Sequence, residues 1–188
     1  MKTLDILRDS LPDYARDLSL NLGSVLAPTG APGLNEKQIW AVALAAAIAS
    51  RNVAFTRDIE ALAAPALDDA HLSAARAAAA VMGMNNVYYR FLHLVGDPEY
   101  AQMPARLRMN VIGKPGIDKL DFELLSLAVS AINGCGMCIE SHEKQLRQHG
   151  VSREAVQSAV RIAATVHAVA RVLEDSASSN QAEAVKAA

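Results

Sequence analysis

Two cysteines and a histidine stand close together in the last third of the chain, at a spacing that suits thiol chemistry. Cys135 and Cys138 are separated by two residues, and His142 follows four residues after Cys138. If a helix begins near Cys135, the three side chains share one stripe of its surface. The start of a helix lowers the pKa of a thiol, and the thiolate is the form that attacks peroxides and disulfides. The spacing therefore predicts a redox-active dithiol, with His142 placed to accept or relay a proton.

A single carboxylate upstream of this motif is a second candidate. Glu123 interrupts the apolar segment LDFELLSLAVSAI, twelve residues before Cys135. The pattern permits two interpretations, a carboxylate exposed to water or a partner of the dithiol. The short turn at Asn133 and Gly134 does not by itself bring Glu123 to the sulfurs, so the sequence leaves both interpretations open.

Other interpretations of the cysteines carry less weight. Both could be small buried hydrophobic residues, and a zinc site could combine Cys135, Cys138 and His142 with either His149 or Glu123. The spacing of those ligands is poor for a zinc site on one helix, so we expect no bound metal. A thioredoxin-type fold is disfavoured because the chain lacks the strand patterns that it requires. A dithiol on a helical scaffold is the remaining interpretation.

The other polar and sulfur-containing residues predict no separate site. The remaining histidines are isolated, and the methionines Met82, Met84 and Met109 are typical of core filling. Asn85 and Asn86 are poor helix formers within a helical pattern, and Tyr88, Tyr89 and Arg90 follow them. We interpret this segment as packing or subunit-interface residues, with a role in the site as the less favoured alternative.

The amino-acid composition indicates the fold class of the scaffold that holds the dithiol. Of the 188 residues, 36 are alanine and only 4% are aromatic, which favours closely packed helices and an all-α fold. The net charge of −2 offers no basic excess for phosphates, so we expect no nucleic-acid partner. The longest uncharged stretches fall short of the ~18 apolar residues of a spanning helix, and the N-terminus has no apolar signal region. We therefore expect a soluble, cytoplasmic protein that does not enter a membrane.

Periodicity and turn signals divide the chain into about seven or eight helices of one domain, residues 1–175, followed by a disordered tail at 176–188. Asn35 and Gln38 form a predicted capping box at the start of an alanine-rich helix. Asp118 caps a helix that ends at Asn133 and Gly134, and the next helix begins at the cysteines. The apolar segments predict helices at 3–22, with a second piece starting near Pro12, and at 36–51, 54–64, 69–94, 118–133, 135–149 and 152–173.

Four segments and one histidine carry a resemblance to a known family. They are LPDYARDLSLNL (11–22), MGMNNVYYR (82–90), RMNVIGKPGI (108–117) and FELLSLAVSAINGCGMC (122–138), together with His142. With these segments the chain resembles the alkyl hydroperoxide reductase AhpD family, within the carboxymuconolactone decarboxylase-like superfamily. The similarity covers most of residues 1–175, and Cys-x-x-Cys-x-x-x-His with an upstream Glu is specific to the redox-active members.

The resemblance implies an all-helical homotrimer with antioxidant peroxidase activity toward alkyl hydroperoxides. It implies that Cys138 is oxidised to sulfenic acid and that Cys135 is the proton donor and resolving thiol. Glu123 and His142 match the proton relay of the family. The implied partners are the peroxiredoxin AhpC and a lipoylated dihydrolipoamide acyltransferase, with dihydrolipoamide dehydrogenase and NADH behind it. No cofactor is expected to be bound, because the dihydrolipoamide is an external electron donor.

One residue departs from the family pattern, and two other functions compete with peroxide reduction. Well-known members carry His directly before the second cysteine, where this chain has Met137, a thioether that cannot donate a proton. We expect the relay through Glu123 and His142 to sustain activity. The competing functions are a decarboxylase-like reaction on a lactone, which needs no dithiol, and a non-catalytic redox sensor or interaction module.

Overall fold

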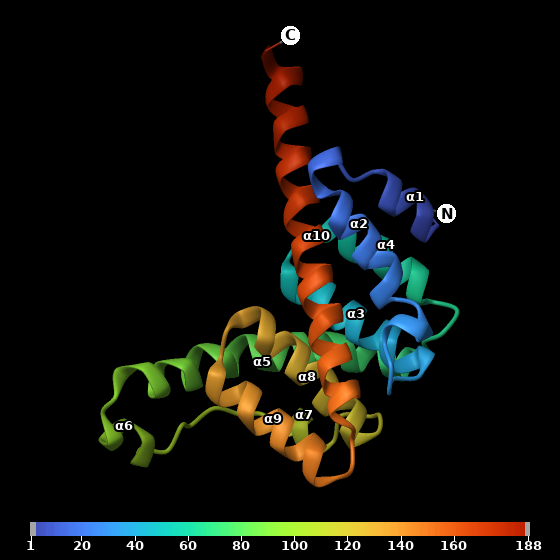
Figure 1. Ribbon diagram of the computed structural model, residues 1–188. Coiled ribbons are helices and arrows are strands. Elements are labelled where there is room, and N and C mark those ends of the chain that lie inside the picture. The colour runs from blue at the N-terminus through green and yellow to red at the C-terminus, as the bar shows by residue number, and fades with distance from the viewer. Residues whose placement is uncertain (1–2, 187–188) are drawn as a thin grey trace.

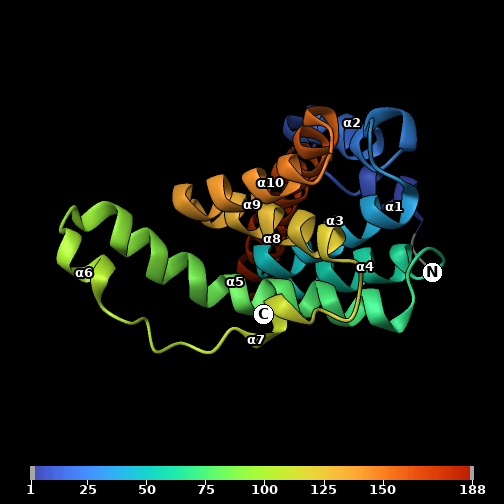
Figure 2. The ribbon, with the colours of Figure 1, turned by 90° about the horizontal axis from the view of Figure 1, so that it is seen from below.

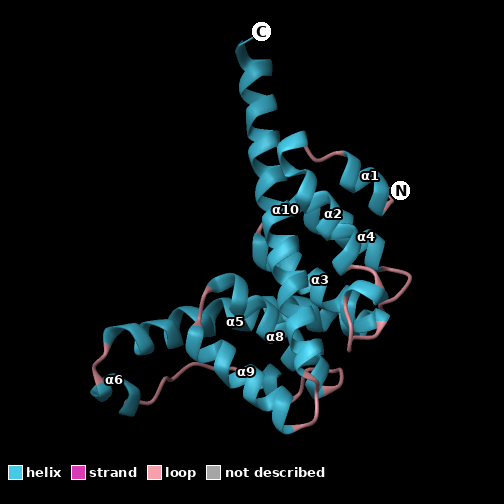
Figure 3. Cartoon of the chain, in the orientation of Figure 1, coloured by secondary structure: helices cyan, strands magenta, loops and turns pink. Residues whose placement is uncertain are grey.

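A computed structural model describes residues 3–186 of the chain, with side chains described up to residue 178. Within residues 3–186 the chain forms helices and loops and contains no strand (Figure 3), so the predicted all-α class is confirmed. The helices are α1 (Leu4–Asp9), α2 (Arg16–Val25), α3 (Glu36–Ser50), α4 (Val53–Ala63), α5 (Asp69–Val95), α6 (Pro98–Gln102), α7 (Asn110–Gly113), α8 (Lys119–Asn133), α9 (Gly136–Gln148) and α10 (Arg153–Lys186).

These ten helices in the described range exceed the predicted seven or eight because of two short helices. The one-turn helices α6 and α7 lie in a region between α5 and α8 that carries loop signals. The second helical piece expected near Pro12 is present, because this proline separates α1 from a 3-10 turn and α2. The helices α3, α4, α5, α8 and α9 agree with the predicted segments to within a few residues, whereas α10 continues well beyond the predicted end at residue 173.

The alanine-rich helix α3 lies at the centre of the fold. Its predicted capping box is confirmed, because the Asn35 Oδ1 accepts a hydrogen bond from the Gln38 backbone N–H and the Gln38 Oε1 accepts one from the Asn35 backbone N–H. Residues Ala41 to Ala47 are all buried, and α4, α5, α8 and α10 pack around them. Small side chains let helix backbones approach closely, which explains how so few aromatic residues suffice for the core.

A helical hairpin of α8 and α9 carries the cysteines. Gly134 ends α8 in a left-handed conformation, with φ of +67°, which a residue without Cβ adopts readily. α8 packs against α3, α5 and α10, and α9 packs against both α8 and α5. The start of α9 is therefore fixed between α8 and the middle of α5, as Figure 2 shows.

The two longest helices reach beyond the central group (Figure 1). The C-terminal part of α5 extends away from it and carries α6 at its end. α10 runs past the expected domain boundary at residue 175, while disorder of the 176–188 tail stays a prediction and residues 187–188 lie outside the described residues. None of the described helices is long and apolar enough to cross a membrane.

Candidate active site

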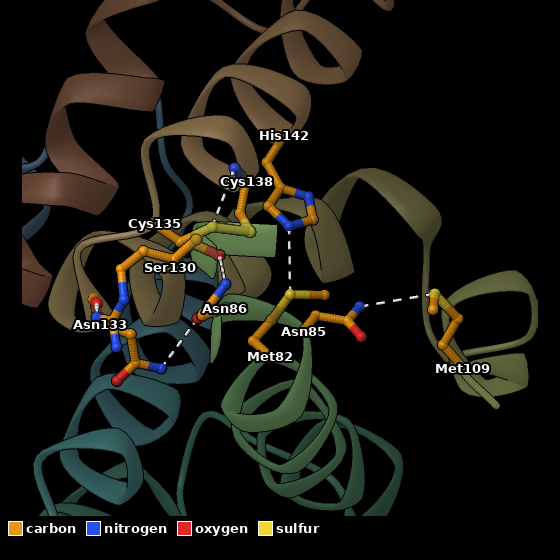
Figure 4. Close-up of a disulfide and its surroundings, with 10 residues drawn as sticks. Met82, Asn85, Asn86, Met109, Ser130, Asn133, Cys135, Cys138 and His142 are labelled. Carbon is orange, nitrogen blue, oxygen red and sulfur yellow. Dashed lines mark hydrogen bonds between the residues drawn. A yellow bond between two sulfur atoms is a disulfide. The ribbon is translucent and has the colours of Figure 1, made fainter. Parts of the chain in front are cut away.

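The two cysteines are joined by a disulfide at the amino end of α9 (Figure 4). Their Cα atoms are 5.3 Å apart, and Cys135 is the N-cap residue, as the expected helix start at the cysteines requires. The Cys135 Sγ accepts a hydrogen bond of 3.3 Å from the backbone N–H of Cys138. A sulfur thus takes the place that a Ser or Asp oxygen has at most helix starts, where free N–H groups favour negative charge.

The two sulfurs differ in their access to solvent. Cys135 is 0% exposed and Cys138 is 6% exposed. Cys138 lines a cavity of about 340 Å³, whereas Cys135 is absent from the residues around it. A small molecule that enters this cavity therefore meets Cys138 first. Its walls are largely apolar, with Met82, Met109, Ile112 and Met137, and carry polar groups from Asn85, Tyr89 and Gln145.

Glu123 and His142 come together beside the cavity. The Glu123 Oε2 lies 2.6 Å from the His142 Nδ1, although the residues belong to different helices. Both side chains are largely buried and both line the cavity with Cys138. Of the two interpretations of Glu123, the geometry supports the partner of the site. A carboxylate at Nδ1 holds the ring proton there in neutral imidazole, which leaves Nε2 as the atom that gains or loses a proton.

The Nε2 atom of His142 faces a methionine in the disulfide form. It lies 3.4 Å from the Met82 Sδ (Figure 4). Among the interactions of the described residues, His142 makes no hydrogen bond to either cysteine sulfur. Proton transfer between His142 and Cys138 therefore takes place through the cavity that both residues line. Either a substrate or water molecule bridges the two side chains, or the imidazole ring turns toward Cys138.

A chain of buried amides supports the other side of the disulfide. The Asn86 Nδ2 donates to the Ser130 Oγ at 2.9 Å, and the Asn133 Nδ2 donates to the Asn86 Oδ1 at 2.9 Å. The Arg90 guanidinium donates a hydrogen bond to the Asn133 carbonyl oxygen at 2.6 Å. The Cys135 backbone N–H donates to the Ser130 carbonyl oxygen. Figure 4 shows this chain on the Cys135 side, away from His142. It fixes the α8–α9 turn against α5.

The sequence interpretation of the α5 segment was incomplete. Met82 and Met109 do pack on the core, as expected, but both also line the cavity together with Asn85 and Tyr89. A signal was present, because Met82, Asn85 and Tyr89 share the three-and-four-residue spacing of Cys135, Cys138 and His142. Residues of both stripes line the cavity, namely Met82, Asn85 and Tyr89 from α5 and Cys138 and His142 from α9.

The structure separates His149, one of the two possible fourth ligands of the zinc interpretation, from Cys135, Cys138 and His142. His149 lies at the opposite end of α9 from the cysteines, where its Nδ1 is 2.8 Å from the Gln145 carbonyl oxygen. In the part of the chain that the structure describes, no group of three or more His, Cys, Asp or Glu side chains is arranged to hold a metal ion.

An all-helical fold with a Cys-x-x-Cys pair at a helix start, and a Glu–His pair beside it, defines a class of helical dithiol proteins. Residues 98–178 match the carboxymuconolactone decarboxylase family. The chain is 58% identical to the alkyl hydroperoxide reductase AhpD of Rhodospirillum centenum over 172 residues, 92% of this chain and 91% of that protein. It is 54% identical to that of Streptomyces coelicolor over 186 residues, 99% of each chain. The chain therefore belongs to the alkyl hydroperoxide reductase AhpD family.

Proposed function

We propose that this protein is a dithiol peroxidase that reduces alkyl hydroperoxides at the Cys135–Cys138 pair. The observation that carries the proposal is the position of the disulfide, with one sulfur in the wall of an apolar cavity and a Glu–His pair in the same wall. An apolar cavity suits the alkyl part of a hydroperoxide, and its few polar groups suit the peroxide end. The relatives are named alkyl hydroperoxide reductases, which supports the same reaction.

The oxidative half of the cycle begins at Cys138, because this sulfur lines the cavity. The Cys138 thiolate attacks the terminal peroxide oxygen, the O–O bond breaks, and the leaving alkoxide takes a proton from the His142–Glu123 pair. Cys138 becomes a sulfenic acid. The Cys135 thiol then attacks the Cys138 sulfur, closes the disulfide and loses its proton, while the sulfenic oxygen leaves as water.

The reductive half of the cycle reopens the disulfide with dihydrolipoamide. A thiolate of the donor attacks the Cys138 sulfur, and Cys135 leaves as a thiolate that the helix amino end stabilises. The second donor thiol closes the lipoamide ring and releases Cys138. The net reaction of the two halves converts hydroperoxide and dihydrolipoamide into alcohol, water and lipoamide.

The proposed partners follow from this electron flow. A lipoylated dihydrolipoamide acyltransferase supplies the donor, and dihydrolipoamide dehydrogenase renews it from NADH. The reduced dithiol also reduces the peroxiredoxin AhpC through a mixed disulfide. These partners, the cytoplasmic location, the absence of a bound cofactor or metal, and the absence of nucleic-acid or membrane partners belong to the proposal.

A homotrimer is also proposed. Its support in this chain is a group of exposed apolar side chains where α5 and α6 extend from the central helices, namely Val87, Phe91, Leu94, Val95, Tyr100 and Met103. A contiguous apolar surface of this kind is typical of subunit contacts.

Multiple turnovers test the proposal against the redox-sensor alternative. The protein is mixed with cumene hydroperoxide and excess dihydrolipoamide, and the alcohol formed is measured per subunit. We expect many equivalents of alcohol per subunit. A yield that stops at one equivalent while dihydrolipoamide remains would instead favour a sensor.

A further inference from the structure

Met82 makes the most informative contact of the site that the proposed cycle does not use. Its Sδ lies 3.4 Å from the His142 Nε2 (Figure 4). Glu123 occupies the Nδ1 side of the same ring. A thioether sulfur can only accept a hydrogen bond, and it accepts weakly. The contact is therefore a hydrogen bond only when Nε2 carries a proton. Met82 consequently lies within reach of the acidic proton of the site.

Methionine is concentrated around this cavity. Three of the six methionines of the chain, Met82, Met109 and Met137, line it beside Cys138. Met84, two residues along α5, packs on the core and does not line the cavity. Thioethers react with hydroperoxides to form sulfoxides. A hydroperoxide that waits beside Cys138 is therefore surrounded by oxidisable sulfur.

We infer that Met82 is a sulfoxidation site for hydroperoxides that enter this cavity, an inference that rests on the proposed function for the presence of a hydroperoxide there. The Met82 sulfur attacks the terminal peroxide oxygen, and the O–O bond breaks. The leaving alkoxide takes the His142 Nε2 proton and departs as the alcohol. The hydroxysulfonium then loses its proton to solvent, and His142 regains one, so that thioether and hydroperoxide become sulfoxide and alcohol.

The proton supply distinguishes Met82 from the other two methionines of the cavity. Leaving alkoxides need a proton, and a positioned acid accelerates such steps by about 10²–10⁴. Among the described residues, the ring nitrogen Nε2 contacts the sulfur of Met82 and not that of Met109 or Met137. Oxidation is therefore selective for Met82 within the cavity.

Oxidation of Met82 to the sulfoxide changes the hydrogen bonding of His142. Its oxygen is a much better hydrogen-bond acceptor than a thioether and lies where Nε2 points. The oxidised Met82 holds the imidazole on the α5 side and away from Cys138, so that peroxide turnover falls. Because methionine sulfoxide is reducible by methionine sulfoxide reductases, the loss is reversible.

The test is a time course of methionine oxidation during turnover. Full-length protein is treated with cumene hydroperoxide in excess over dihydrolipoamide, and peptide mass spectrometry follows sulfoxide at each methionine. We expect Met82 to be oxidised at least about tenfold faster than Met84, and His142→Asn to remove most of that difference. Activity lost in step with Met82 oxidation should return after treatment with a methionine sulfoxide reductase.

Two variants connect the modification to the loss of activity. Met82→Leu should keep a larger fraction of its own initial rate under excess hydroperoxide than the wild type does. Met84→Leu, the matched control on α5, should lose activity at the wild-type rate. Equal oxidation of Met82 and Met84 in the wild type would overturn the inference, and so would rapid Met82 oxidation that His142→Asn leaves unchanged.

These outcomes are separable from a failure of the proposed function. Selective Met82 oxidation without peroxide consumption at Cys138 would contradict the proposed cycle and support the Met82 site. Peroxide turnover at Cys138 with an unoxidised Met82, even after the donor is exhausted, would support the cycle and overturn the Met82 site.

Discussion

Glu123 on α8 and His142 on α9 share a hydrogen bond of 2.6 Å at the wall of the cavity that Cys138 lines. The helical hairpin turns back at Gly134, so residues nineteen positions apart meet beside the dithiol. Glu123 fixes the orientation of the imidazole through Nδ1, while Nε2 faces Met82 in the wall of the cavity.

Removing the charge of Glu123 tests this pairing. We expect Glu123→Gln to lower the rate of alcohol formation from cumene hydroperoxide by about 100-fold, because the imidazolium loses its counter-charge. Glu140→Gln on the exposed side of α9 is the matched control and should keep the wild-type rate. A Glu123→Gln variant with the wild-type rate and pH profile would contradict the role of the pair.

Cys135 has a structural role as the cap of α9 in addition to its proposed redox role. In the reduced protein, Cys135→Ser should be more stable than Cys135→Ala by about 1 kcal/mol, because the Ser Oγ can accept the Cys138 N–H. Urea denaturation of both variants under reducing conditions measures the difference. Equal stabilities would show that the cap contributes nothing.

Removing the hydrogen bonds of Asn86 should strongly lower the stability of the fold. Asn86→Leu leaves the Ser130 Oγ and the Asn133 Nδ2 without the partners that Asn86 provides, which should lower the free energy of unfolding by about 2–4 kcal/mol. Ser126→Ala is the control, because the buried Ser126 Oγ has no hydrogen-bond partner already. Its removal should be neutral or stabilising, and a larger loss in Ser126→Ala than in Asn86→Leu would contradict this account.

His167 makes stability depend on pH. Burial, and secondarily the charge of Arg171, lower the pKa of His167 below its usual value of 6.5. As the pH falls below about 6.5, the unfolded chain binds a proton at this residue before the folded chain does, so stability decreases. Above that pH both states are neutral and the contribution is complete. His167→Gln should therefore reduce the fall in stability between neutral and acidic pH, as measured by urea titrations.

Local features of the fold were predictable because they depend on neighbours in the sequence. Asn35 and Gln38 mark a helix start, Gly134 marks a helix end, and the cysteine spacing marks the site. The contact of His142 with Met82 was not predictable, because it joins residues sixty positions apart on different helices. Alanine-rich faces are chemically alike, so composition predicts close packing without specifying which helices pair.

Asn85 and Asn86 also separate what the sequence predicts from what depends on the packing of the helices. Their low helix propensity marked the segment as unusual, but their different duties depend on the face of α5 that each occupies. Asn85 lines the cavity, while Asn86 bonds Ser130 on the Cys135 side. Only the packing of α5 against α8 and α9 separates the two roles.

The central claim is that Cys138 is the sulfur that attacks the hydroperoxide, and a single-turnover measurement tests it most directly. Fully reduced wild type, Cys135→Ser and Cys138→Ser are mixed with cumene hydroperoxide without any donor, and consumption is measured with a sulfenic-acid trap present. We predict that the wild type and Cys135→Ser rapidly consume about one equivalent, with the trap on Cys138 in the latter. Cys138→Ser should show no rapid consumption, and any slow consumption by it is that of the inferred Met82 oxidation. Equal consumption by Cys138→Ser and the wild type would contradict the account.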